Sequence, residues 1–297
     1  MNLSKLTLAL ILIASPLVLH AQATVVQCKE LFSKDYKTQD FVISIEGKKQ
    51  SKLFLEKAHE NLIAENDPVQ LNVILNKMSD YGVPSLSIEQ RNFIFKFRQN
   101  SSLLRSIFQT SDKNHLSPNK FGRFVKDFGV LKDFLMMSDS ENAQIMAIDI
   151  LKKYSDLDFK KLIKKAQPAS KKSVALYFNG ILENAKKIMS KSVMTIDEVH
   201  DVRKHLRDVL RYIQIERDLA IEGEKEISAE KEDAIYFLKK LNTKLGFVCD
   251  DYAAQILRDQ NSGSPDRVTK KTLVEFPVEL RPKVEHFLNL YVVQVTE

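Results

Sequence analysis

Tryptophan is absent from this chain of 297 residues, and glycine and proline are scarce, with eight of each. Glycine and proline are the residues that most often interrupt regular elements, whereas leucine, lysine, isoleucine, glutamate and alanine are plentiful here. Hydrophobic residues make up 44% of the chain, which is enough for one large domain or two small ones with real cores. The composition therefore predicts a mostly helical protein.

The motifs of the common enzyme classes are also missing. The chain has no glycine-rich phosphate-binding loop, no Gly-x-Ser-x-Gly sequence and no paired catalytic cysteine and histidine. The pair His200-Asp201 is similar to part of a metal phosphohydrolase site. That chemistry needs further ligands, and no metal-ligand spacing is found among the other histidines after residue 23, which are His59, His115, His205 and His286. We therefore expect a protein that is not an enzyme, without metal or cofactor.

Long apolar runs are absent after the N-terminus. Residues 1–23 combine a positive residue, Lys5, an apolar stretch from Leu6 to Leu19 and an Ala-Gln-Ala sequence, the three parts of a secretory signal peptide. No later segment has the ~18 uninterrupted apolar residues that a membrane span needs. We therefore expect residues 1–23 to be removed, the protein to be exported to the bacterial periplasm or the medium, and the mature chain to have no membrane span.

Only two cysteines, Cys28 and Cys249, are present in the whole chain. An even number of cysteines in an oxidising compartment favours a disulfide, and two buried free thiols are the alternative. A bridge would tie the N-terminal segment, residues 24–50, to the second half of the chain.

A large excess of one charge is missing too, because the formal net charge of +6 is too small to argue for a nucleic-acid partner. The distribution is more informative. On a helix over residues 199–216, the basic side chains His200, Arg203, Lys204, Arg207 and Arg211 share an arc of about 100°. Arg203 and Arg207 lack the carboxylate one helical turn away that a solvated charged face usually has. Such a ladder of guanidinium groups suits a chain of phosphates, and a solvated face is the alternative.

Apolar residues recur at helical spacing almost throughout the chain after Ser51. We predict helices near 51–65, 68–80, 86–108, 118–138, 140–153, 157–166, 171–190, 195–221, 226–246, 248–260 and 278–292. Residues 41–45 read as a short strand or a helix start, and residues 272–277 as an extended segment. The sequence Gln-Pro-Ala-Ser at 167–170 divides the chain into two helical halves, 51–166 and 171–297.

Two short patterns occur twice in the same order. Residues 128–133 and 245–250 both read apolar, Gly, apolar, apolar, variable, Asp, and a basic helical stretch precedes each. This match predicts an internal duplication in which Gly129 corresponds to Gly246, and Arg91 in the first basic stretch to Arg203 in the second. Asp133 and Asp250 should either cap a following helix or hold the basic helix by salt bridges.

The sequence His-Asp-Val-Arg-Lys-x-x-Arg-x-x-x-Arg-Tyr-x-x-x-Glu at 200–216, followed by Leu-x-x-x-Leu-Gly-x-x-x-Asp at 241–250, resembles the second half of a CHAD domain. This histidine-containing helical family binds inorganic polyphosphate. The resemblance covers residues 85–290 roughly. It implies an all-α fold of two duplicated antiparallel bundles with pseudo-two-fold symmetry and a basic channel between them. In the first half, Ile88 stands where the family has its histidine, and Lys96 and Arg98 represent a denser basic run.

The resemblance implies a set of ligand-binding residues from both halves, namely His200, Arg203, Lys204, Arg207, Arg211, Arg91, Lys96 and Arg98. We therefore expect non-enzymatic binding of inorganic polyphosphate or a similar polyanion in the cell envelope, with nucleic acid a less favoured partner. Cell-envelope polyanions such as phosphorylated glycans are a related possibility. The alternative is a helical scaffold or protein-interaction module that has lost the phosphate ligand.

Overall fold

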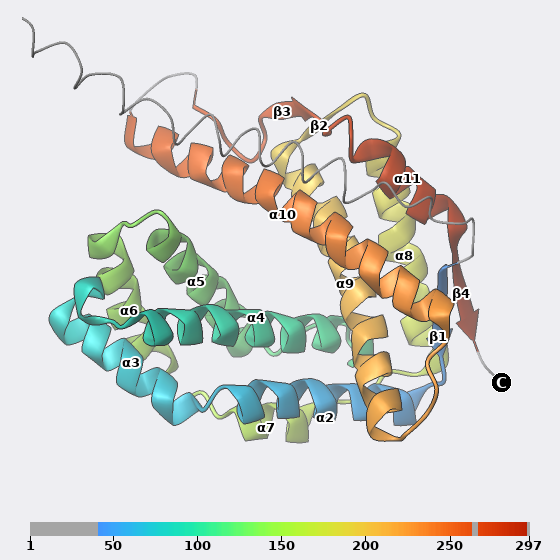
Figure 1. Ribbon diagram of the computed structural model, residues 1–297, viewed down its shortest axis with the longest axis horizontal. Coiled ribbons are helices and arrows are strands. Elements are labelled where there is room, and N and C mark those ends of the chain that lie inside the picture. Colours follow the sequence, from blue (N-terminus) through green and yellow to red (C-terminus); the bar gives the residue numbers. More distant parts are fainter. Residues whose placement is uncertain (1–40, 263–266, 296–297) are drawn as a thin grey trace, which may run out of the picture. The chain divides into compact units, whose positions relative to one another are not determined.

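The computed structural model describes residues 41–262 and 267–295, and most of these are helical (Figure 1). The all-α class predicted from the sequence is confirmed. The first helices are α2 (Lys48–Glu65), α3 (Pro68–Tyr81), the 3-10 helix η1 (Val83–Ser85), α4 (Ile88–Ser111), α5 (Asn119–Met136), α6 (Ser140–Tyr154) and α7 (Phe159–Lys165). They are followed by α8 (Lys171–Met189), α9 (Ile196–Glu222), α10 (Ala229–Ser262) and α11 (Arg281–Leu290). The short strands are β1 (Phe41–Ile45), β2 (Val193–Thr195), β3 (Leu273–Glu275) and β4 (Tyr291–Val295).

The helix starts follow local sequence signals. Asp67 caps α3, where its side chain accepts from the backbone N–H of Val69, and proline occupies the first position of that helix. The two long helices that matter most below, α4 and α9, both begin with a capping box, in which Ser87 pairs with Gln90 and Thr195 with Glu198. These reciprocal bonds satisfy backbone donors that would otherwise lack partners, which explains why both starts could be read from the sequence.

Two predicted boundaries are wrong. Helix α10 runs without a break from Ala229 to Ser262, where two helices separated at residue 247 are predicted. The predicted C-terminal helix ends at Leu290, and the next five residues form β4, which pairs in parallel with β1 from Phe41↔Tyr291 onward. Strand β1 resolves the open alternative for residues 41–45 in favour of a strand. The expected extended segment at 272–277 contains β3, which pairs antiparallel with β2.

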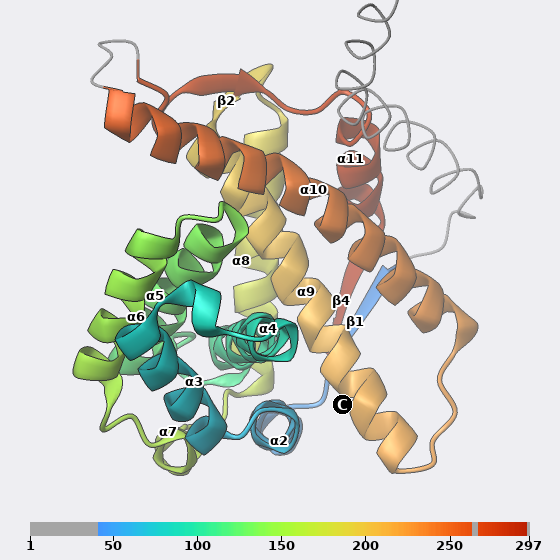
Figure 2. The same ribbon diagram turned by 60° about the vertical axis from the view of Figure 1, so that its left-hand side comes forward.

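Helix α9 is packed on several sides. Helix α4 crosses it, α10 and α8 flank it, and α2 lies alongside α4 (Figures 1 and 2). Aromatic side chains fill both regions of the core. Phe97 of α4 lies 5.5 Å from Phe128 of α5 between ring centroids, and Tyr212 of α9 lies 4.7 Å from Phe54 of α2 and 4.8 Å from Phe178 of α8. Buried rings therefore pack α4 against α5, and α9 against α2 and α8.

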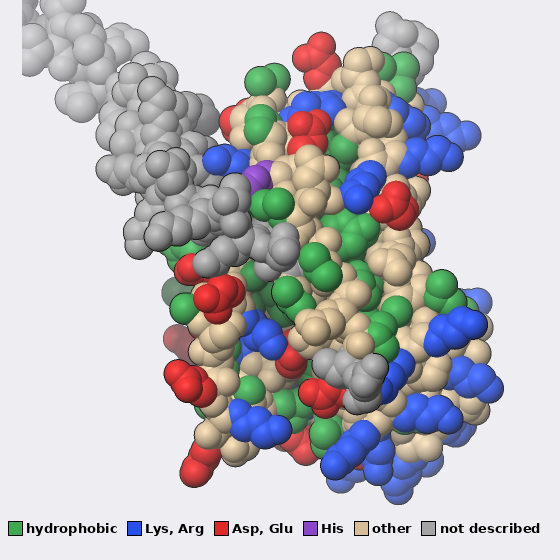
Figure 3. Space-filling view, turned by 90° about the vertical axis from the view of Figure 1, so that its right-hand side faces the viewer, with side chains coloured by type: hydrophobic (Ala, Val, Ile, Leu, Met, Phe, Trp, Pro, Cys, Tyr) green, Lys and Arg blue, Asp and Glu red, His purple; other side chains and the backbone are tan. Residues whose placement is uncertain are grey.

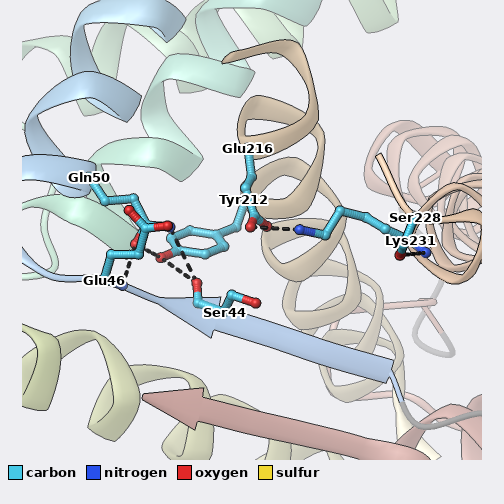
Figure 4. A network of polar contacts seen from close by, with 7 residues as sticks. All are labelled: Ser44, Glu46, Gln50, Tyr212, Glu216, Ser228 and Lys231. Atoms are coloured by element: carbon cyan, nitrogen blue, oxygen red, sulfur yellow. Dashed lines mark hydrogen bonds and ion pairs between the residues drawn. The ribbon is translucent and has the colours of Figure 1, made fainter. Parts of the chain in front are cut away.

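Polar contacts fix α9 to the start of the described chain (Figure 4). The buried hydroxyl of Tyr212 donates to Oε1 of Gln50 at 2.9 Å and to the backbone carbonyl of Ser44 at 3.4 Å. One turn further along α9, the carboxylate of Glu216 accepts from Lys231 of α10 at 2.6 Å. Burial raises the pKa of Glu216, and the bond to Lys231 opposes this rise. These bonds orient the half of α9 that follows its basic residues.

Several expectations lie outside the described residues or are not supported by them. The predicted signal peptide at 1–23 and Cys28 are outside the described residues. Cys249 is a buried free thiol, so the structure does not support the predicted disulfide. The two predicted halves contain different numbers of helices in the described chain, and the duplicated two-bundle arrangement is not established. Among the described helices, none has the length and apolar character needed to cross a membrane.

Candidate polyanion-binding groove

A groove of about 620 Å³ opens where α4 crosses α9, with α5 and α10 on either side. We call it the basic groove because seven of its lining side chains are cationic: Arg98, Arg105, Lys132, Arg203, Lys204, Arg207 and Arg211. Two lining residues are acidic, Asp133 and Asp250. The remaining walls include Phe95, Ser102, His200 and Cys249. Positive charge is therefore concentrated in one concave site rather than spread over a helix face.

All five residues predicted on α9 line the basic groove: His200, Arg203, Lys204, Arg207 and Arg211. From α4, the structure brings Arg98 to the groove but not Arg91 or Lys96. Arg91 lies near the start of α4, and its guanidinium donates to the carbonyl of Val83 at 3.3 Å. Lys96 is exposed and does not line the groove. Two of the eight predicted binding residues are thus outside the site.

The register of α4 explains this difference. Arg91, Arg98 and Arg105 are spaced seven residues apart, so they lie on one helix face, two turns from one another. Periodicity alone cannot tell which of them reaches the crossing with α9. In the structure Arg98 lines the groove together with Arg203, whereas Arg91 is the predicted counterpart of Arg203. Phe95 rather than Ile88 lines the groove with His200. Arg105 and Lys132 were not among the predicted binding residues. The seven-residue spacing from Arg98 could have identified Arg105.

Two glycines have the same role on opposite walls. A Cβ atom at Gly129 of α5 would lie 3.1 Å from Nη2 of Arg98, and one at Gly246 of α10 would lie 3.0 Å from Nη2 of Arg203. Both distances are shorter than ordinary carbon contacts. Each guanidinium therefore lies flat against a helix backbone that only glycine leaves open. The two Gly motifs of the sequence thus leave room for arginines of the neighbouring helix. Gly246 has this packing role inside α10 and does not mark the end of a helix.

Four guanidinium groups in the groove have an Nε atom that is buried and has no hydrogen-bond partner among the described residues, namely those of Arg98, Arg105, Arg203 and Arg207. Burial, the nearby charge of Arg207 and other neighbouring arginines lower the pKa of Arg98 to about 10. Burial also lowers the pKa of Arg207 and of Arg211, and neighbouring arginines add to the effect. The arginines stay charged at neutral pH, so the groove holds several cations that repel one another.

Arg211 differs from the other arginines because it is bonded within the protein. Its Nη1 donates to Oγ of Ser102 at 2.9 Å and to Oγ of Ser106 at 2.7 Å, both on α4. Ser106 in turn donates to the buried carboxylate of Asp208 at 2.6 Å, which also accepts from the hydroxyl of Tyr177 on α8 at 3.1 Å. Asp208 is 1% exposed. This chain of bonds joins α4, α8 and α9 directly beneath the basic groove.

The acidic side chains lie together near Lys132. Its Nζ is 3.4 Å from Asp133 and 3.9 Å from Asp250, and Arg203 is 4.0 Å from Asp250. Burial raises the pKa of Asp133, and the neighbouring charge of Asp250 adds to this rise. Both aspartates lie inside helices, so the prediction that they cap a helix is wrong. The ion-pair alternative agrees with the structure for Asp250 and Arg203, although the contact is long.

His200 stands at the start of the cationic ladder with part of its ring exposed. Partial desolvation and the positive charges of Arg207 and Arg203 lower the pKa of His200 to about 4. Its imidazole is therefore neutral at pH 7. Cys249 faces the same arginines, and burial raises the pKa of its thiol. Within the described residues, no group of three or more His, Cys, Asp or Glu side chains is arranged to hold a metal ion.

Comparison with protein-family models, with curated proteins and with solved structures finds no match. The function is therefore inferred from the chemistry of the basic groove.

Proposed function

We propose that the basic groove binds inorganic polyphosphate or a similar polyanion without catalysing a reaction on it. The observation that carries this proposal is the group of four arginines in one groove whose Nε donors are buried and have no hydrogen-bond partner among the described residues. Buried donors without partners are costly, and like charges held together are costly as well. An anion with many oxygen atoms would relieve both, because each phosphate accepts several charge-assisted hydrogen bonds.

The spacing on α9 supports a chain of phosphates as the ligand. Arg203, Arg207 and Arg211 are each separated by one helical turn, which rises about 5.4 Å. Arg211 is held by Ser102 and Ser106, so Arg203 and Arg207 are the α9 arginines most available to a ligand. Arg98 and Arg105 face them from α4. Cations on both walls suit a flexible polyanion that follows the groove. The expected export of the protein would place this binding in the cell envelope.

The first prediction is that the double variant Arg203→Ala/Arg207→Ala binds long-chain polyphosphate about 100-fold or more weakly than the natural protein at ~50 mM salt. Each substitution removes a charge-assisted contact worth roughly 1.5–3 kcal/mol. Each lost phosphate contact should also reduce the slope of log affinity against log salt by roughly one unit, as for nucleic acids. Titration calorimetry at two salt concentrations, ~50 and ~200 mM, measures both quantities.

The matched control is Lys160→Ala/Lys164→Ala on α7, which removes the same number of charges from exposed positions. It addresses a real competitor, because lysines are frequent between residues 160 and 191. Lysine and arginine side chains also gather on part of the face shown in Figure 3. The control should leave affinity nearly unchanged. If the control weakened binding and the arginine variant did not, the polyanion would bind on the outer surface. If the natural protein did not bind at ~50 mM salt, the helical scaffold would be the better interpretation.

A further inference from the structure

A second cavity adjoins the basic groove and differs from it in chemistry. It has a volume of about 310 Å³ and shares Arg203, Arg207 and Arg211 with the groove. Its other polar walls carry amides, a hydroxyl and one further cation, from Gln99, Asn100, Gln214, Asn242, Thr243 and Lys239. We call it the amide pocket. None of its lining residues is acidic, and Leu103 and Leu210 supply an apolar surface.

Asn242 shows most clearly what this pocket can bind. The residue is 8% exposed, and its Nδ2 donates to the carbonyl of Leu238 at 3.1 Å. This bond fixes the orientation of the amide, because a carbonyl only accepts. Its Oδ1 is therefore an acceptor, and it is buried without a hydrogen-bond partner among the described residues. A buried acceptor is satisfied only by a donor such as a hydroxyl, an amine or water.

An inorganic phosphate chain does not supply that donor. Its ionised oxygens only accept hydrogen bonds, so they match arginine but not an amide carbonyl. Hydroxyl groups both donate and accept, and so do the carboxamides of Gln99, Gln214 and Asn242. The apolar side chains of Leu103 and Leu210 can contact the C–H face of a carbon skeleton. The pocket thus combines the features of a site for a hydroxyl-rich group that lies beside its cationic side chains.

We propose that the amide pocket holds the polyhydroxylated part of a phosphate ester whose phosphate groups lie on Arg203 and Arg207. The ligand class is then a phosphorylated sugar or polyol rather than a phosphate chain alone. This inference rests on the proposed function, because both cavities meet at the same arginines. It specifies the ligand class more closely: the basic groove binds the phosphate groups, and the amide pocket selects the polyhydroxylated carbon skeleton that carries them.

Three ligands separate these contributions in calorimetric titrations of the whole protein. Fructose 1,6-bisphosphate carries two phosphates and free hydroxyls, 1,6-hexanediol bisphosphate carries two phosphates on a chain without hydroxyls, and tripolyphosphate carries no carbon. We expect the sugar bisphosphate to bind about tenfold more tightly than the diol bisphosphate, as expected for one or two additional hydrogen bonds. Because both carry two phosphate esters, a difference between them is due to the hydroxyls.

The variant Asn242→Leu should reduce affinity for the sugar bisphosphate about tenfold and leave the diol bisphosphate and tripolyphosphate unchanged. Gln214→Met, which keeps side-chain length, provides a second test on α9 if the first variant folds poorly. The matched control is Asn76→Leu, because Asn76 of α3 also donates to the carbonyl four residues earlier and lies outside both cavities.

Each outcome has one reading. Equal affinity for the two bisphosphates, or an equal loss for all three ligands in Asn242→Leu, would overturn the amide pocket as a selective site while leaving the basic groove intact. Absence of binding by all three ligands, with long-chain polyphosphate still bound, would overturn this inference alone, whereas absence of polyphosphate binding as well would refute the proposed function. Selective loss of the sugar bisphosphate in both pocket variants, with Asn76→Leu unchanged, supports the inference.

Discussion

Arg203 and Arg211 lie two turns apart on α9, yet their surroundings give them different roles. Arg211 is bonded to two serines of α4 and is part of the structure beneath the groove. Arg203 lies against Gly246 with its Nε unpartnered. A ladder of identical residues on one helix face is thus divided by the neighbouring helices into a structural member and members available to a ligand. At the scale of single residues, the role of each arginine of α9 is determined by the neighbouring helix that it contacts.

The glycines allow this division to be tested. In Gly246→Ala the new methyl group would lie 3.0 Å from the guanidinium of Arg203 and should displace it. Alanine favours a helix over glycine by about 1 kcal/mol, so we expect unchanged or higher stability together with several-fold weaker polyphosphate binding. Gly180→Ala on α8 is the control, because apart from the adjacent residues and the backbone of its own helix no atom lies within 4 Å of the added Cβ. It should raise stability without changing affinity. Urea unfolding and titration of both variants measure the two effects, and equal binding by Gly246→Ala would contradict the role of this contact.

His200 predicts a pH dependence with a definite sign. Its pKa of about 4 in the free protein lies below the ordinary value of 6.5, because of partial burial and the nearby arginines. A polyanion in the groove favours the imidazolium form and raises the pKa of His200 in the complex. Binding should therefore take up a proton, and affinity should increase as the pH falls from 7 toward 5. Calorimetry in buffers of different ionisation enthalpy detects this uptake. In His200→Phe the uptake due to this residue should vanish, and an unchanged uptake would assign it to another group.

At the scale of elements, the crossing of α4 and α9 depends on one buried carboxylate. Asp208 accepts from Ser106 and Tyr177, and it is the acid closest in sequence to Arg207 and Arg211. Asp208→Ala leaves the buried positive charge uncompensated and should lower the free energy of unfolding by about 3–5 kcal/mol. Tyr177→Phe removes one hydrogen bond and should cost only about 1–2 kcal/mol. Urea denaturation compares them. Equal losses in the two variants would mean that charge compensation by Asp208 contributes little.

The elements also show what the sequence could predict. The starts of α3, α4 and α9 were readable because caps and prolines act within a few residues. The continuity of α10 was not, because Gly246 is tolerated for the sake of an arginine on another helix. Strand β4 was missed for a similar reason, since its partner β1 lies about 250 residues away in the chain.

For the candidate site, too, the sequence predicted what local patterns determine and not what contacts between distant segments determine. The arc on α9 identified five lining residues, because helical periodicity is a local property. On α4, Arg98 was predicted correctly, but Arg91, the predicted counterpart of Arg203, lies two turns before the groove. The crossing point of two helices is set by packing that neither helix encodes alone. Lys132 and the amide pocket come from elements that meet only in the folded chain. Local patterns thus predicted one wall of the site, and tertiary packing determined the others.

At the scale of the whole molecule, the basic groove is a cost to stability that a ligand can relieve. Loss of contact with water lowers the pKa of Arg98, Arg207 and Arg211, and repulsion from neighbouring arginines lowers it further. A protein that keeps such a site is expected to be less stable without its ligand than it could be. The chain also carries a net charge of +6, so the repulsion is not offset by an excess of acidic residues elsewhere.

The last prediction follows from this balance. Without ligand, Arg203→Ala/Arg207→Ala should be more stable than the natural protein by about 0.5–2 kcal/mol, because the repulsion is reduced. Polyphosphate at about 100 times its dissociation constant should stabilise the natural protein by about 2.7 kcal/mol, which raises Tm by roughly 5–10 °C. The double variant should show little of this rise at the same concentration. Thermal unfolding of both proteins with and without polyphosphate tests the two changes together. Relief of repulsion should raise the Tm of the double variant without ligand, and ligand binding should raise the Tm of the natural protein. A double variant that is less stable without ligand would show that these arginines stabilise the fold, which would contradict their role as mutually repelling groups that bind an anion.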